Sequence, residues 1–216
     1  MSERIKKLLL FTLSACPMGR SMNTVLGEVL ASKQDLAYEI VYVDVDHETT
    51  NHYRVKTNPT TLFLDWNGKE LYRLEQFRET SEVMGLFEQI EEEGLRSDEP
   101  REENEATNES YTVYLYDRGQ AVPVKTESIN RTSVKAPRIS TIKQLLRTRP
   151  EGLDNPFPAD ASLEQVSFHI DSGIVTLRSS SAPNDQENRQ MEALLALTLA
   201  PYGIHEIKLE WVENSR

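Results

Sequence analysis

The segment Ser14-Ala15-Cys16-Pro17-Met18-Gly19-Arg20 decides how the first half of this chain folds. It follows an apolar run, residues 8–13, and it precedes apolar residues at helical spacing, namely Met22, Val25, Leu26, Val29 and Leu30. This pattern predicts a strand that leads into the first turn of a helix, with Cys16 between the two. Backbone N–H groups and the helix dipole favour a thiolate at such a position. Because Cys16 is the only cysteine, the chain cannot close a disulfide within itself.

The residues that follow continue this alternation of strands and helices. Residues 38–46 are rich in β-branched and aromatic side chains and predict a second buried strand. The stretch 53–64 contains Asn58-Pro59-Thr60 before its apolar end, and a turn at Asn67-Gly68 leads into a further strand over residues 70–74. A helix that begins at Thr80 or Ser81 is indicated by the apolar face of Val83, Leu86, Phe87 and Ile90.

In this order of elements, residues 4 to about 93 resemble the thioredoxin family. Cys16 resembles the family's nucleophile, and Asn58-Pro59-Thr60 resembles its cis-proline loop. The resemblance implies an α/β thioredoxin-like domain over residues 1–93. It also implies that the cis-proline loop lies against Cys16 and offers backbone groups to an extended substrate. We therefore expect Pro17, Asn58 and Pro59 to be substrate-binding residues.

Two departures from the thioredoxin pattern bear on the chemistry. Gly19 stands where the family has its second cysteine, and Leu10 stands where it has a buried acidic residue that handles the proton of that cysteine. These departures exclude a dithiol reductase or oxidase. Two alternatives remain. One is a monothiol reaction in which an external thiol completes the exchange, and the other is a semi-buried thiol in a degenerate thioredoxin that serves as a binding platform.

Arg20 lies one helical turn beyond Cys16, and its positive charge favours a thiolate. Cys16 and Arg20 are therefore the candidate catalytic residues. No metal site and no cofactor are expected. His169 has no cysteine or second histidine near it in the sequence, and His205 is interpreted as a strand-edge residue rather than a ligand.

The same segment also permits a different interpretation. Arg4, Lys6 and Lys7, a short apolar stretch and Leu13-Ser14-Ala15-Cys16 resemble a bacterial lipoprotein signal that ends in a lipobox. The apolar run is shorter than the roughly 7–15 residues of a secretory signal, and cleavage before Cys16 would delete the first strand. We expect a retained N-terminus and a cytoplasmic protein, with an extracytoplasmic lipoprotein as the alternative.

The 216-residue chain is too long for one thioredoxin-like domain and requires a second domain. Residues 91–109 carry nine of the acidic side chains against Arg96 and Arg101, in a chain of net charge −11. Residues 94–109 contain few apolar side chains and are predicted to form a solvated acidic linker. This acidity argues against a nucleic-acid partner, since phosphate binding needs a basic face.

The remaining residues, 110–216, predict an α+β domain. Alternating runs at 111–116 and 121–129 indicate a hairpin, and helical spacing follows at 139–149. A second hairpin turns at Asp171-Ser172-Gly173, and it is followed by an amphipathic helix over residues 184–199 and a strand over residues 205–212. The order ββαββαβ predicts helices on one face of a mainly antiparallel sheet.

This half resembles the GerMN domain of sporulation and spore-germination proteins over about residues 110 to 213. The resemblance rests on Pro150-Glu151-Gly152-Leu153, the proline-bearing stretch 155–161, and Leu197-Thr198-Leu199 before Tyr202-Gly203-Ile204. Members of that family typically serve in assembly or germination rather than in a known reaction, and they are often lipid-anchored outside the cytoplasm.

Two functional hypotheses follow. In the first, the chain is an interaction or assembly module of spore-forming bacteria, with a degenerate thioredoxin-like platform and a GerMN-like domain that binds a partner or a copy of itself. In the second, it is a monothiol thiol-disulfide oxidoreductase that acts through Cys16 with an external resolving thiol. Both imply a protein partner and no membrane span, and both leave the oligomeric state open.

Overall fold

The computed structural model describes residues 4–33, 35–95, 102–181 and 183–213, and its contacts divide the chain into two compact units. The first comprises the residues up to Ala106 together with Arg131–Lys135. The second comprises Thr107–Asn130 and the residues from Ala136 onward. Each unit is described by itself below.

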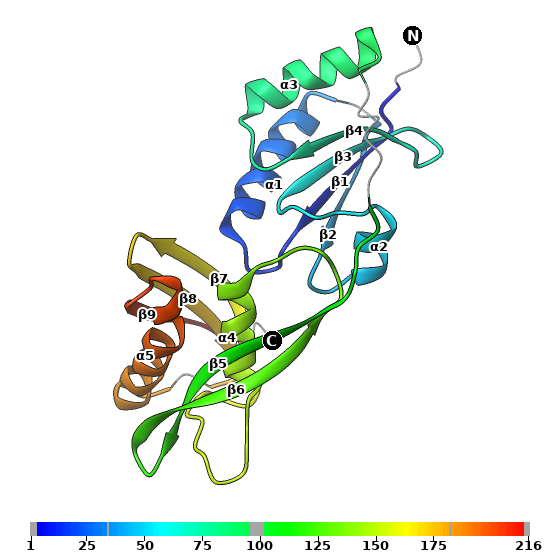
Figure 1. The fold of residues 1–216 in the computed structure, drawn as a ribbon. Helices are drawn as coiled ribbons and strands as arrows, with labels where there is room; N and C mark the ends of the chain where they lie inside the picture. Colours follow the sequence, from blue (N-terminus) through cyan, green and yellow to red (C-terminus); the bar gives the residue numbers. More distant parts are fainter. Residues whose placement is uncertain (1–3, 34, 96–101, 182, 214–216) are drawn as a thin grey trace. The chain divides into compact units, whose positions relative to one another are not determined.

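The first unit is built on one four-stranded sheet in the order β2-β1-β3-β4 (Figure 1). Strand β1 runs parallel to β2 and antiparallel to β3, and β3 is antiparallel to β4. The elements are β1 (Lys7–Thr12), α1 (Pro17–Ala31), β2 (Ala37–Tyr42), α2 (His47–His52), β3 (Thr60–Leu64), β4 (Glu70–Glu75), α3 (Thr80–Glu88) and a short π-helix at Gln89–Glu93. This arrangement confirms the predicted α/β thioredoxin-like fold.

Strand β1 is the centre of this unit, and its alternate side chains are buried on both faces of the sheet. Leu8 and Leu10 pack into an apolar cluster with α1 and α3. On the other face, Phe11 meets the ring of Tyr53 edge-on, at 5.8 Å between ring centroids. Leu10, which stands where thioredoxins have an acidic residue, therefore lies in a wholly apolar core.

The predicted linker differs from the structure in its second half. Residues 96–101 lie outside the described residues, and β5 already begins at Thr107. Asn104 packs against α2: its Nδ2 donates to Asn51 Oδ1 at 2.9 Å and to the Val55 carbonyl at 3.1 Å. Asn51 Nδ2 in turn donates to the carbonyl of Arg131 at 3.0 Å. These partners belong to distant segments, so the acidic composition of the segment does not reveal them.

The second unit has the predicted order of elements, ββαββαβ. Its helix α5 opens on a capping box formed by Asn184 and Glu187 and packs against β5 and β9. The elements are β5 (Thr107–Asp117), β6 (Gln120–Asn130), α4 (Pro137–Arg147), β7 (Ser162–His169), β8 (Ser172–Ser179), α5 (Asp185–Leu199), a 3₁₀ turn at Ala200–Tyr202 and β9 (Glu206–Glu213).

The prediction of one mainly antiparallel sheet in this unit was wrong. The described strands form a separate hairpin, β5-β6, and a three-stranded sheet, β7-β8-β9. Strand β9 pairs with β8 in parallel, because the connection between them crosses over through α5. The turn between β7 and β8 also differs from the prediction: it consists of Ile170 and Asp171, and Ile170 has a positive φ of 33°.

No helix in the described part of the chain is long and apolar enough to cross a membrane.

Candidate functional site

Cys16 is the N-cap residue of α1 and follows the end of β1 through a tight turn. Its backbone N–H donates to the Leu13 carbonyl at 3.1 Å, and its φ and ψ of −83° and 122° are extended rather than helical. Pro17 then occupies the first turn of the helix, where its fixed φ suits the start and its missing N–H costs nothing. The Cys16 side chain makes no capping hydrogen bond, and the residue is partly exposed.

The side chain of Asn58 joins the Cys16 sulfur to the end of β1. Its Nδ2 donates to Cys16 Sγ at 3.3 Å, and its Oδ1 accepts from the Leu13 backbone N–H at 3.0 Å. Because the Leu13 N–H can only donate, it fixes which end of the amide faces the sulfur. The peptide bond between Asn58 and Pro59 is cis. The structure therefore brings Asn58 to Cys16, as the resemblance implied.

Pro59 is held in place by the residue that follows β4. Its carbonyl accepts from the Gln76 backbone N–H at 2.8 Å. The segment that leads into the proline loop is fixed by Arg73, a largely buried residue of β4. The Arg73 guanidinium pairs with Glu70 at 2.8 Å and donates to the carbonyls of Tyr53 and Arg54. The segment before the proline loop is thus held by the buried Arg73, whose charge is paired with the partly buried Glu70.

Gly19 lies against Thr12 of β1 with no space for a side chain. A Cβ built on Gly19 would lie 1.7 Å from Thr12 Oγ1 and 2.6 Å from Thr12 Cβ. Both residues are buried. The position of the second thioredoxin cysteine therefore holds a glycine, and packing against Thr12 leaves no space for a cysteine side chain there. The sequence gives the glycine but does not reveal that Thr12 is its neighbour.

Arg20 is turned toward the backbone of the loop that connects β1 to α1. Its Nη2 donates to the carbonyl of Ala15 at 3.5 Å, and its backbone N–H donates to the Cys16 carbonyl at 3.4 Å. This geometry gives the residue a role in holding the turn before the helix. Its predicted catalytic role stays a prediction.

Sequence reasoning missed Asp44, which fixes the loop before Cys16. Its two carboxylate oxygens accept from the Ser14 backbone N–H at 2.9 Å and from Ser14 Oγ at 2.7 Å. Since β1 and β2 are parallel, their carboxyl ends lie at one edge of the sheet, and an acidic residue just after β2 is the signal that could have identified it. Beside this edge, the side chains of Met18 and Val45 are 48% and 69% exposed.

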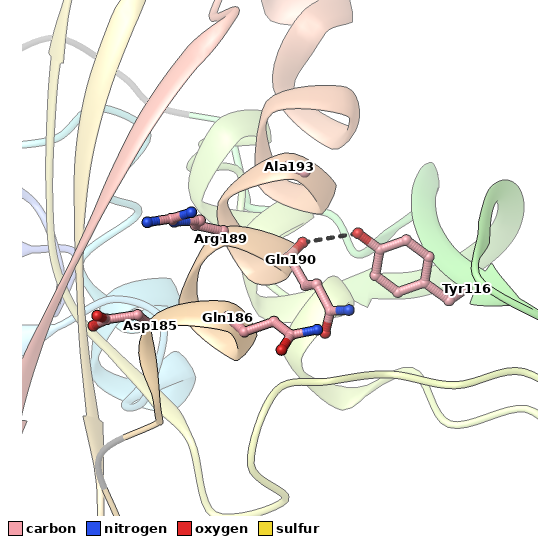
Figure 2. A pocket seen from close by; sticks show the side chains of 6 residues that line it. All are labelled: Tyr116, Asp185, Gln186, Arg189, Gln190 and Ala193. Carbon is pink, nitrogen blue, oxygen red and sulfur yellow. Dashed lines mark hydrogen bonds between the residues drawn. The ribbon is translucent and has the colours of Figure 1, made fainter.

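The described residues hold no group of three or more His, Cys, Asp or Glu side chains arranged for a metal ion. A depression of about 540 Å³ lies on the second unit, lined by Tyr116, Asp185, Gln186, Arg189, Gln190 and Ala193 (Figure 2). The Tyr116 hydroxyl donates to the Gln190 carbonyl at 3.2 Å, and partial burial raises the pKa of Tyr116. Figure 2 shows Asp185 and Arg189 directed away from Tyr116, so the lining does not converge on a reacting centre.

No protein-family model matches the chain, and no curated protein matches it. Among solved structures, thioredoxin-2 of a malaria parasite is 19% identical over 41% of this chain and 85% of its own, with a TM-score of 0.37. Thioredoxin 1 of Thermosipho africanus is 24% identical over 41% of this chain and 97% of its own, with a TM-score of 0.36. An alkylhydroperoxide reductase of Enterococcus faecalis is 12% identical over 99% of this chain and 72% of its own, with a TM-score of 0.39.

Proposed function

We propose that the thioredoxin-like unit is a protein-binding platform that engages an extended segment of a partner at the edge formed by Cys16, Asn58 and Pro59. The observation that carries the proposal is the packing of Gly19 on Thr12, which leaves no room for a resolving thiol. Asn58 donates a hydrogen bond to the Cys16 sulfur, and the Pro59 carbonyl accepts one from the Gln76 backbone N–H. These contacts support a site that binds a partner without dithiol chemistry.

The surroundings of the thiol support binding. Met18 and Val45 expose apolar side chains beside the site, and covering them is favourable by roughly 25 cal/mol per Å² of apolar surface removed from water. The loops that carry Cys16 and Asn58 are fixed by Asp44 and by the buried Arg73. A pre-organised edge loses little conformational freedom when a partner binds.

We further propose that the second unit directs this platform to its partner in the assembly steps of sporulation or germination, in the cytoplasm. This part of the proposal rests on the GerMN resemblance of residues 110–213. The order of elements on which that resemblance is based, ββαββαβ, supports this part of the proposal.

A second candidate function is monothiol exchange, favoured by the hydrogen bond from Asn58 Nδ2 to Cys16 Sγ. In the first step, the Cys16 thiolate attacks a client disulfide, forms a mixed disulfide and releases one client thiolate. In the second step, an external thiolate attacks the client sulfur of the mixed disulfide. This regenerates the Cys16 thiolate and leaves the external thiol and the client joined by a new disulfide.

Site-specific photo-crosslinking in cells tests the platform. A photoreactive residue replaces Met18, beside the site, or Trp66, which is 80% exposed in the β3–β4 turn and serves as the matched control. We expect a discrete protein adduct from position 18 that resists reducing agent and is absent from position 66. Equal adducts from both positions would contradict the platform. Adducts that form only through Cys16 and are cleaved by reducing agent would favour monothiol exchange instead.

A further inference from the structure

Among the strands that the structure describes, none pairs with the outer edge of β6 in the hairpin β5-β6, and the register of the hairpin shows which residues form this edge. The two strands close on a two-residue turn, Arg118 and Gly119, with Asp117 paired to Gln120. In antiparallel strands, hydrogen-bonded and non-hydrogen-bonded pairs alternate from such a turn. The pairs 116–121, 114–123, 112–125, 110–127 and 108–129 are therefore the ones whose backbone groups point away from the partner strand.

Two contacts of β5 support this alternation. Tyr116 exchanges backbone hydrogen bonds with Asp154 at 2.9 and 2.8 Å, and the Tyr114 N–H donates to Thr198 Oγ1 at 3.1 Å. Both β5 residues thus direct their backbone groups outward, away from β6. Their partners on β6, Ala121 and Pro123, direct theirs to the opposite edge. In Figure 1 that edge is the side of β6 remote from β5.

The side chains along this edge are exposed. Within β6, Pro123, Lys125, Glu127 and Ile129 alternate with less exposed residues, and Ile129 is 62% exposed. A proline and a lysine on an edge strand guard it against indiscriminate pairing. Ile129 and Glu127 lie in the same row, and protection of the edge does not explain them.

We propose that this edge pairs with the same edge of a second copy of the chain, antiparallel about a two-fold axis at Thr126. Lys125 then lies opposite Glu127 of the second copy, and Glu127 lies opposite its Lys125. Pro123 lies opposite Ile129 of the second copy, so each exposed isoleucine gains an apolar neighbour. Charge and apolar character are both complementary in this one register.

Neighbouring registers are unfavourable. An axis at Lys125 places the two lysines opposite each other, and an axis at Glu127 places the two glutamates opposite each other. Like charges in directly opposed positions destabilise a strand pair. Pro123 has no N–H to donate, but in the proposed register its carbonyl still accepts from Ile129 of the second copy. The charged residues thus disfavour the two neighbouring alignments.

The pairing would convert the two-stranded hairpin, which already packs against α4 and α5 through β5, into a four-stranded sheet. It would also place two Cys16 sites in one assembly. The inference does not rest on the platform function, because it uses only residues of β5 and β6.

Sedimentation of the full chain over a range of concentrations tests the pairing. We expect a concentration-dependent dimer. Lys125→Glu and Glu127→Lys should each weaken the dimer roughly tenfold by opposing like charges. The double variant Lys125→Glu/Glu127→Lys should recover the wild-type dimer, since it only exchanges the two partners. Lys69→Glu and Glu92→Lys make the same charge changes at exposed positions elsewhere and should leave the dimer unchanged.

A wild-type chain that stays monomeric at its highest soluble concentration would overturn the pairing, as would single variants that dimerise like wild type. The register has its own check. In Cys16→Ser/Thr126→Cys, the two introduced cysteines face each other across the axis at about 4.5 Å between Cα atoms, within reach of a disulfide. We expect a covalent dimer on mild oxidation, and its absence would exclude this register. Loss of the dimer would leave the Met18 photo-crosslink intact, so this inference and the proposed function fail separately.

Discussion

The start of α1 and the tip of the β7-β8 hairpin differ in how well the residue type suits its position. At Gly19, the smallest residue stands where any side chain would collide with Thr12. At Ile170, a β-branched residue stands with a φ of 33°, a conformation that costs such residues energy, and it is 100% exposed. The first region is closed by packing and surrounds the candidate site. The backbone of the second region is strained, and the fully exposed Ile170 side chain makes no packing contact that offsets the strain.

The packing of Gly19 against Thr12 should be the most sensitive feature, so its substitution should change stability the most. Gly19→Ala should lower the free energy of unfolding by about 3 kcal/mol, because the new methyl group overlaps Thr12 in a packed interface. Chemical denaturation measures it. Gly27 lies in the same helix with nothing within 4 Å of its missing Cβ, so Gly27→Ala should instead stabilise by about 0.5–1 kcal/mol.

A double-mutant cycle identifies the neighbour. In a Thr12→Gly background, the atoms that the Gly19→Ala methyl group meets are absent, so the cost of that substitution should fall. An unchanged cost in that background would mean that the collision with Thr12 is not the cause.

The loop before Cys16 should be the next most sensitive. Asp44→Ala removes the acceptor of both Ser14 hydrogen bonds and should destabilise the protein by about 2 kcal/mol. Asp44→Asn keeps one acceptor oxygen and should cost less. Thermal and chemical denaturation measure both variants. An Asp44→Ala variant as stable as wild type would show that this loop is held by other contacts.

The hairpin tip should respond in the opposite direction. Ile170→Asn should raise the free energy of unfolding by about 1 kcal/mol, because asparagine adopts positive φ more readily and the isoleucine side chain buries nothing. Ile170→Val keeps the branched Cβ and is the matched control, with no gain expected. A loss of stability in Ile170→Asn would contradict the assigned strain.

The smallest effect is a pH dependence in the second unit. Hydrogen bonds from Ser180 and then Ser179 lower the pKa of Asp160 to about 2. A carboxyl group with a lowered pKa stabilises the folded state above its unfolded value of about 4, and this contribution is lost as the pH falls through the folded value. Asp160→Asn should therefore be less stable than wild type at neutral pH, with a difference that vanishes between about pH 4 and pH 2. A pH-independent difference would contradict the assignment.

The sequence predicted the parts of the site that local patterns determine. The strand, the cysteine and the helix start follow from apolar spacing around Cys16, and the thioredoxin resemblance supplied Asn58 as its neighbour. Thr12 and Asp44 were missed. Their contacts depend on how α1 crosses β1 and on where β2 ends, and neither leaves a periodic signal in the sequence.

The same distinction holds in the second unit. Alternation and helical spacing predicted its element order, since each element carries its own period. The division into two sheets was not predictable in this way. The sequence of β9 shows the same alternation whether the strand pairs in parallel or antiparallel. Its direction is decided by the crossover through α5. The Ile170 turn was misplaced because its residues do not follow the usual turn chemistry.

The interpretation of Cys16 as part of a lipobox can be tested directly. Strand β1 lies between β2 and β3, so cleavage before Cys16 would remove a central strand of the sheet. Intact-mass measurement of the protein purified from its native host should show residues 1–15 retained and no lipid on Cys16. A diacylated N-terminal Cys16 would overturn both the cytoplasmic proposal and the free thiol.

On the proposed function, the edge formed by Cys16, Asn58 and Pro59 binds a partner whether or not the thiol reacts. The most direct measurement is the yield of the photo-crosslink from position 18 in a Cys16→Ser background, compared with Pro59→Ala. We predict that the adduct persists in Cys16→Ser, because binding does not need the sulfur to exchange, and that it is lost in Pro59→Ala. Loss of the adduct in Cys16→Ser, with the fold intact by circular dichroism, would mean that binding at this edge depends on a reaction of the thiol.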